Sequence, residues 1–171
     1  FISEDAILTS NTSGLNLNSL SDGMSDSLKK RFFITHFFNP PRYMRLVEFI
    51  VSESNDSEVV DAMAGFFENT LGKGVVFSND TPNFIANRIG IYGMMKAIDK
   101  TVKYNLSVDE VDLLTGSLIG RPKSATYRTA DLAGIDVLSF VASTALNKCK
   151  DDDENSIYKI PDFIEKLIER G

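Results

Sequence analysis

Short apolar runs alternate with polar, turn-forming stretches over the first 80 residues of the chain. Runs that are rich in β-branched and aromatic side chains, and bounded by Gly, Pro, Asn or Ser, favour strands. Longer segments with apolar side chains every three or four positions favour helices. This alternation of strands and helices is typical of an α/β fold. Strands are predicted at Ala6–Ser10, Arg31–Phe38, Leu46–Val51 and Val75–Phe77, and helices at Ser19–Lys30 and from Asp56 or Ser57 to about Leu71.

The apolar pattern changes to a purely helical period after Pro82. Ser107-Val-Asp-Glu110 has the form of a capping box, and Gly134 is a residue that breaks helices. The expected fold class is therefore α/β plus all-α, with residues 1–80 forming an α/β unit and residues 81–171 forming an all-helical unit. Helices are predicted from Asn83 to about Tyr104, after Ser107, on either side of Gly134, and from Pro161 to near Arg170.

Composition and charge restrict the classes of partner. The 171 residues carry a net charge of −6 with a pI near 4.8, which argues against the clustered Lys and Arg of a nucleic-acid-binding surface. No run reaches the roughly 18 to 20 apolar residues that span a bilayer. Cys149 is the only cysteine, so the chain forms no internal disulfide and a cytoplasmic setting is favoured. We interpret the charged run Lys148–Asn155 as a solvated loop and not as a metal site.

His36 is the only histidine and lies at the end of a predicted strand, among phenylalanine residues. A lone histidine in an apolar setting is more often structural than catalytic, although its side chain exchanges protons near neutral pH. Glu48 lies on the next predicted strand, beyond a Pro-Pro turn that could bring it alongside. A carboxylate on one ring nitrogen would fix the tautomer and leave the other nitrogen to accept a proton. The spacing alone leaves both interpretations open.

Four motifs resemble those of 3-hydroxyacyl-CoA dehydrogenases and occur in the same order along the chain as in that family. His36-Phe-Phe-Asn-Pro40, followed by Met44-Arg-Leu-Val-Glu48, resembles the signature of that family. Ser10-Asn-Thr-Ser13 resembles its Ser-Asn-Thr-Ser loop. Asp80-Thr-Pro-Asn-Phe-Ile-Ala-Asn-Arg88 resembles its Asp-Thr-Pro-Gly-Phe-Ile-x-Asn-Arg segment, with Asn83 in place of the glycine. The resemblance covers nearly the whole chain, so a chance match is not expected.

The replacement at Asn83 also indicates a branch of the family. Together with Gly120-Arg-Pro-Lys-Ser-Ala-Thr126 and Arg128, it is similar to the branch in which the dehydrogenase is fused to an enoyl-CoA hydratase in a larger polypeptide. A fused hydratase domain is therefore a possible partner. The resemblance further implies that the helical unit helps to form the substrate cleft and makes a homodimer, which fits the several apolar faces of residues 81–171.

The resemblance implies NAD-dependent oxidation of (S)-3-hydroxyacyl-CoA to 3-oxoacyl-CoA in fatty-acid β-oxidation. His36 would remove the proton of the 3-hydroxyl group and Glu48 would orient and charge-stabilise His36. Ser13 would hydrogen-bond the reacting oxygen, and Asn87 would contact the substrate near the same centre. Each polar residue also has a structural interpretation, as a turn former, a strand stop or a helix residue. Candidates for contact with the cofactor are Asn11 and Asn39.

The chain departs from the family pattern at two places. It has no Gly-x-Gly-x-x-Gly after a first strand and no acidic ribose-binding residue behind it, so the pyrophosphate-binding turn of a dinucleotide fold is missing. The family's helical domain also continues beyond the position of Gly171. We therefore expect the second half of a Rossmann-type domain joined to a truncated helical domain, with weak NAD binding. The competing hypothesis is a non-catalytic helical dimerisation or acyl-CoA-binding module.

Overall fold

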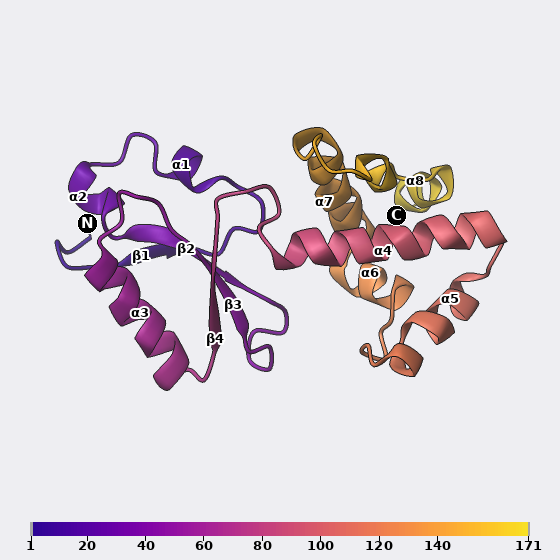
Figure 1. Ribbon diagram of the computed structural model, residues 1–171, viewed down its shortest axis with the longest axis horizontal. Coiled ribbons are helices and arrows are strands. Elements are labelled where there is room, and N and C mark those ends of the chain that lie inside the picture. The colour runs from indigo at the N-terminus through magenta and orange to yellow at the C-terminus, as the bar shows by residue number, and fades with distance from the viewer. Residues whose placement is uncertain (1, 171) are drawn as a thin grey trace. The chain divides into compact units, whose positions relative to one another are not determined.

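The computed structural model describes residues 2–170, which form two compact units divided between Ile85 and Ala86 (Figure 1). The first unit contains a four-stranded sheet in the order β1-β2-β3-β4. Strands β1 and β2 are parallel, β2 and β3 are antiparallel, and β3 and β4 are parallel. The four predicted strands are therefore confirmed, with bounds of Leu8–Ser10 for β1, Phe32–Phe37 for β2, Leu46–Ile50 for β3 and Gly74–Ser78 for β4.

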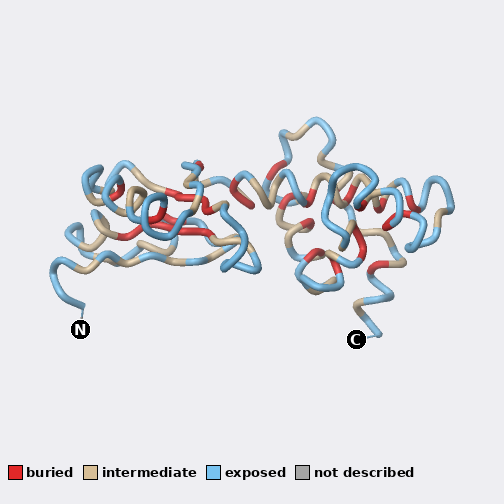
Figure 2. The backbone as a smooth tube through the Cα atoms, turned by 90° about the horizontal axis from the view of Figure 1, so that it is seen from below, coloured by how far each residue is buried: buried red, intermediate tan, exposed pale blue. Residues whose placement is uncertain are grey.

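Both faces of this sheet are covered by helices, because alternate side chains of a strand point to opposite faces. On one face, Phe33 and Phe49 pack against Val60 and Phe67 of α3 (Ser57–Asn69). The opposite face packs Phe32, Ile34 and Ile50 against Leu17 of α1 (Leu17–Leu20). In Figure 2 the buried stretches of this unit run along the strands.

The region from Ser19 to Lys30 differs from the single short helix that its polar pattern predicts. It holds the end of α1 and a second one-turn helix, α2 (Asp26–Lys29). Gly23, between them, has a φ of 75°, a left-handed conformation that interrupts a helix. The side chains of Asn16 and Ser25 cap the two starts by accepting backbone N–H groups.

Within the residues that the structure describes, the second unit contains helices joined by loops and no strand. Its core is formed by one apolar cluster that includes Met95, Ile98, Leu138 and Ala142. The predicted capping box at Ser107 is confirmed, since the Ser107 hydroxyl accepts the N–H of Glu110 and the Glu110 carboxylate accepts that of Ser107. The helices are α4 (Ala86–Tyr104), α5 (Val108–Thr115), η1 (Ser117–Ile119), α6 (Tyr127–Ala133), α7 (Ile135–Lys148), η2 (Asn155–Tyr158) and α8 (Asp162–Glu169).

Helix α4 begins at Ala86, three residues after the predicted start at Asn83. Asn83 and Phe84 have φ values of 64° and 50°, so neither can belong to a right-handed helix. Each non-glycine residue in this region costs about 1 kcal/mol or more, least for asparagine. The asparagine at a family glycine position is thus explained by the backbone conformation there.

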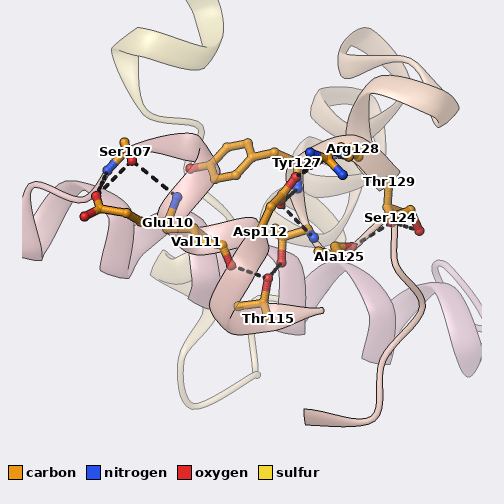
Figure 3. Close-up of polar contacts among 11 residues, drawn as sticks. Ser107, Glu110, Val111, Asp112, Thr115, Ser124, Ala125, Tyr127, Arg128 and Thr129 are labelled. Carbon is orange, nitrogen blue, oxygen red and sulfur yellow. Dashed lines mark hydrogen bonds and ion pairs between the residues drawn. The ribbon is translucent and has the colours of Figure 1, made fainter. Parts of the chain in front are cut away.

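The buried carboxylate of Asp112 in α5 binds the start of another helix, α6 (Figure 3). Its Oδ1 accepts the backbone N–H groups of Thr126 and Tyr127, and its Oδ2 accepts that of Arg128. These donors are the first N–H groups of α6, which have no partner within the helix. Asp112 therefore acts as the N-terminal cap of α6 from a distant position in the sequence.

The acidic loop Asp151–Glu154 is mostly exposed, but it is not merely solvated as the charge pattern predicts. Asp152 forms an ion pair with Arg88 of α4, and Glu154 accepts hydrogen bonds from Tyr92 and Lys96 of the same helix. These contacts fasten the loop to α4.

No single helix within residues 2–170 has both the length and the hydropathy needed to cross a membrane. Helices α6 and α7 together have the required length and hydropathy, but the pair is bent by 99°.

Candidate active site

The β2–β3 hairpin places His36 directly opposite Glu48 in the antiparallel register. Residues paired in this way project from the same face of a sheet with their Cβ atoms about 5 Å apart. The strand spacing across the Pro40-Pro41 turn therefore brings the two side chains together, as the sequence predicted. Both lie on the sheet face that carries Ile34 and Ile50.

His36 and Glu48 form a buried hydrogen-bonded pair. The distance from His36 Nδ1 to Glu48 Oε2 is 2.8 Å, and the side chains are 5% and 1% exposed. Because a carboxylate oxygen only accepts, Nδ1 carries the proton and Nε2 is the nitrogen that can accept one. Within residues 2–170 every fully enclosed side-chain nitrogen or oxygen has a hydrogen-bond partner. Nε2 has no partner there, so it is not fully enclosed.

Two phenylalanine rings hold the imidazole of His36. Phe38 contacts it edge to face with centroids 4.6 Å apart, and Phe84 lies at 5.5 Å. The second oxygen of Glu48 is also engaged, since the N–H of Ile85 donates to Oε1 at 3.0 Å. The pair is thus held by neighbours on both sides, and one ring nitrogen stays accessible for proton transfer.

The other predicted site residues of the first unit lie at the carboxyl ends of β1 and β2. Asn11 Oδ1 accepts the N–H of Phe37 at 3.0 Å, which ties the loop after β1 to the strand that bears His36. Ser13 lies two residues further along that loop and is exposed, as is Asn39 after β2. Asn87 belongs to the second unit, in the first turn of α4.

Sequence reasoning missed Phe84 and Ile85 as neighbours of the pair. Both fit the apolar period of the predicted helix, which concealed their role. A signal was present, because the family motif has glycine at the position of Asn83, and a conformation that needs glycine is not helical. Phe38 is adjacent to His36 within its own motif and could have been assigned from it.

The fold and the histidine–carboxylate pair define a class: part of a dinucleotide-binding α/β unit followed by a helical unit. Residues 1–81 match the family model described as the NAD binding domain of 3-hydroxyacyl-CoA dehydrogenase. Residues 84–171 match the model of the C-terminal domain of the same enzyme. The chain belongs to the 3-hydroxyacyl-CoA dehydrogenase family.

Relatives of known sequence agree with this assignment. A Bacillus subtilis protein named a probable 3-hydroxyacyl-CoA dehydrogenase is 47% identical over 97% of this chain, which covers 21% of that protein. A Rickettsia prowazekii protein, named as a fatty acid oxidation complex trifunctional enzyme, is 38% identical over 100% of this chain and 24% of its own length. The chain thus spans about a fifth to a quarter of these relatives.

Solved structures support the same family. The (S)-3-hydroxybutyryl-CoA dehydrogenase PaaH1 from Ralstonia eutropha superposes with a TM-score of 0.84 at 25% identity, over 99% of this chain and 57% of that one. FadB2 from M. tuberculosis gives the same TM-score at 26% identity, over 99% and 57% of the two chains. The arrangement of strands and helices is therefore shared with enzymes of this family.

Proposed function

We propose that this chain supplies the catalytic base for NAD-dependent oxidation of (S)-3-hydroxyacyl-CoA to 3-oxoacyl-CoA, as part of a longer enzyme. The observation that supports it most is the buried bond of 2.8 Å between His36 Nδ1 and Glu48 Oε2. Burying a carboxylate costs solvation free energy unless it is hydrogen-bonded, and here the bond from Nδ1–H compensates that cost and leaves Nε2 as the proton acceptor.

In the proposed reaction, His36 Nε2 accepts the proton of the substrate 3-hydroxyl group. The C3–H bond breaks with its electron pair as the C3–O double bond forms. NAD, when bound, supplies the acceptor for that hydride. Glu48 stabilises the positive charge that develops on the ring of His36 and holds its orientation. Ser13 donates a hydrogen bond to the reacting oxygen, and Asn87 contacts the substrate near C3.

The residues present fit one end of NAD and not the other. The amide nitrogen of Asn11 has no partner within residues 2–170, while its Oδ1 is held by Phe37, so the side chain can donate to a carboxamide. Asn39 is exposed at the end of β2. Both would serve the nicotinamide end. No glycine-rich turn in the sequence offers backbone N–H groups to a pyrophosphate, so we expect calorimetric titration of this chain with NADH to show weak binding.

The test of the proposed base uses a longer protein that carries this sequence behind a glycine-rich nucleotide-binding segment. His36→Gln keeps side-chain size and a hydrogen-bonding group but removes the proton acceptor. We expect kcat with a short 3-hydroxyacyl-CoA to fall about 10²- to 10⁴-fold, with little change in KM. Retained kcat, or a loss through KM alone, would return His36 to a structural role.

We also propose that the helical unit forms a homodimer. It exposes a series of large apolar side chains at Leu113, Leu118, Ile119, Leu132 and Phe140, which are 61–80% exposed. Apolar surface of this kind in a small helical unit favours association with a second copy. Sedimentation at micromolar concentration should give a dimer, Leu118→Glu should weaken it, and Ser156→Glu at an exposed position of η2 should not. A monomer throughout would reject the interface.

A non-catalytic dimerisation or acyl-CoA-binding module is the second candidate, because the apolar helical surface does not depend on His36. The two are separated by the same measurements. Dimerisation without any loss of kcat in His36→Gln would favour the module. The fused enoyl-CoA hydratase of the longer protein is likewise a proposal, supported by the likeness to the Rickettsia prowazekii protein.

A further inference from the structure

The segment between β4 and α4 contains two consecutive left-handed residues, Asn83 and Phe84. Both are buried, with exposures of 2% and 3%. Asparagine adopts this conformation more readily than other non-glycine residues, but a bulky phenylalanine does so only when its surroundings impose it. Strained backbone of this kind persists where neighbouring contacts hold it, so its partners indicate its purpose.

The contacts of this segment lead to the base. The φ of 50° at Phe84 coincides with a ring that lies 5.5 Å from the ring of His36. The next residue, Ile85, directs its backbone N–H to Glu48 Oε1 at 3.0 Å, while Oε2 of the same carboxylate is bonded to His36. One short turn therefore touches both members of the pair.

The segment is also anchored at its other end. Asp80 Oδ1 accepts the N–H of Leu17 at 3.0 Å, which ties the start of the segment to α1. Phe84 N–H donates to the carbonyl of Thr81 at 3.0 Å, which closes the turn. A turn fixed at both ends can determine the orientation of the carboxylate that it contacts.

We propose that the left-handed turn Asn83–Ile85 is a positioning element for the catalytic base, acting on Glu48 through the Ile85 N–H and on His36 through the Phe84 ring. The proposal rests on the proposed function of His36. With both oxygens engaged, Glu48 cannot rotate away from Nδ1, so the neutral ring keeps its proton on Nδ1 and presents Nε2 as the acceptor. Removing the Ile85 donor weakens the hold of this turn on the carboxylate and lets the ring populate both tautomers.

The matched pair Ile85→Pro and Ile85→Ala tests the donor. Ile85 is 40% exposed, so its side chain is dispensable, but only proline removes the N–H. Because His36 is the only histidine, the ring ¹⁵N resonances of the 171-residue chain report one imidazole and distinguish its tautomers. We expect Ile85→Ala to retain the Nδ1–H tautomer and Ile85→Pro to show a mixture.

The longer enzyme provides the kinetic readout. Ile85→Pro should lower kcat about 10-fold with an unchanged KM, as for partners that orient a functional histidine, whereas Ile85→Ala should not. Equal tautomers and equal kcat in the two variants would overturn the proposal. The tautomer measurement does not require catalysis, so it tests the positioning even if His36→Gln retains activity and the base assignment fails.

A second variant covers the case in which Ile85→Pro does not fold. Phe84→Leu keeps an apolar side chain in the buried position but removes the ring that contacts His36. We expect the His36 ring protons to lose an aromatic ring-current shift and kcat to fall with KM unchanged, while Phe66→Leu at an exposed position of α3 leaves both as they are. A His36 spectrum and kcat unchanged by Phe84→Leu would overturn the proposal.

Discussion

Within residues 2–170 each unit has one buried carboxylate, Glu48 in the first and Asp112 in the second, and the two have different partners. Glu48 shares one oxygen with the imidazole of His36 and the other with a peptide N–H. Asp112 gives its two oxygens to three peptide N–H groups at the start of α6. Peptide groups do not titrate in this range, whereas an imidazole exchanges protons near neutral pH. Burial alone therefore does not identify a catalytic carboxylate; the nature of its partner does.

The largest expected effect separates the two carboxylates by activity. In the longer enzyme, Glu48→Gln removes the charge that stabilises the protonated ring, and kcat should fall about 10²- to 10⁴-fold. Because the two residues act as a unit, adding Glu48→Gln to His36→Gln should cost little more than either change alone. Asp112→Asn, assayed per folded molecule, should leave kcat unchanged. An additive double variant would indicate that Glu48 and His36 act separately.

The next expected effect is a loss of stability, and it concerns Asp112 and not Glu48. Asp112→Ala leaves three N–H groups at the start of α6, two of them in buried hydrogen bonds, without their acceptor, and we expect the free energy of unfolding to fall by about 2 to 4 kcal/mol. Asp109→Ala, an exposed change in the same helix, should cost only a few tenths of a kcal/mol to about 1 kcal/mol. Urea unfolding of both variants measures the difference. Equal losses would show that the cap is not the source of the stability.

The sequence predicted the first carboxylate and not the second. The position of Glu48 opposite His36 could be predicted because strand register depends on a local pattern. Here two apolar runs are joined by a Pro-Pro turn, and each run carries a family motif. Asp112 lies in a helix whose pattern resembles any amphipathic helix. Its donors follow 14 to 16 residues later, after a stretch whose path no periodicity specifies.

The errors in the predicted helices have a common cause. Left-handed backbone at Asn83 and Phe84 interrupts a stretch that is continuous in hydrophobic period, and left-handed Gly23 interrupts a polar stretch. Periodicity reports which face a side chain occupies if the helix continues, and it carries no information on whether it does. The glycine at position 23 is a visible breaker, whereas the conformation of Phe84 depends on contacts with His36, which only the fold reveals.

A third carboxylate, Glu154, extends the comparison to the surface. Hydrogen bonds from Lys96 and then Tyr92 lower the pKa of Glu154 below its ordinary value. A depressed carboxyl pKa contributes stability above the ordinary value, and that stability is lost as the pH falls through the folded-state pKa. We expect Glu154→Gln to melt at a slightly lower temperature than the parent at pH 7 and at the same temperature in strong acid.

The matched control for Glu154 is its neighbour Asp153, which is exposed. Asp153→Asn should melt like the parent at both pH values. High salt should reduce the difference between Glu154→Gln and the parent, because an exposed ion pair is screened. A difference that persists in acid would mean that the loop is held by contacts other than this carboxylate.

The smallest effect concerns Cys149, which is buried without the donors that Asp112 has. Burial raises the pKa of the Cys149 thiol, an effect that Arg88 opposes. A raised thiol pKa means that the folded state holds its proton more tightly than the unfolded state. The associated stability is complete below the ordinary thiol pKa and is lost as the pH rises through the folded-state value. We therefore expect the stability of the parent relative to Cys149→Ala to decline above about pH 9, the region of thiol ionisation.

Urea midpoints at neutral and alkaline pH measure this difference, and the titration of lysine and tyrosine cancels because both proteins carry the same residues. The thiol itself gives an independent check, since a buried and protonated cysteine reacts slowly with a disulfide reagent in the folded protein and at once in denaturant. Fast reaction in the folded protein would show that Cys149 is solvated. Cys149 could then no longer serve as the buried neutral group with which the hydrogen-bonded carboxylate of Asp112 is compared.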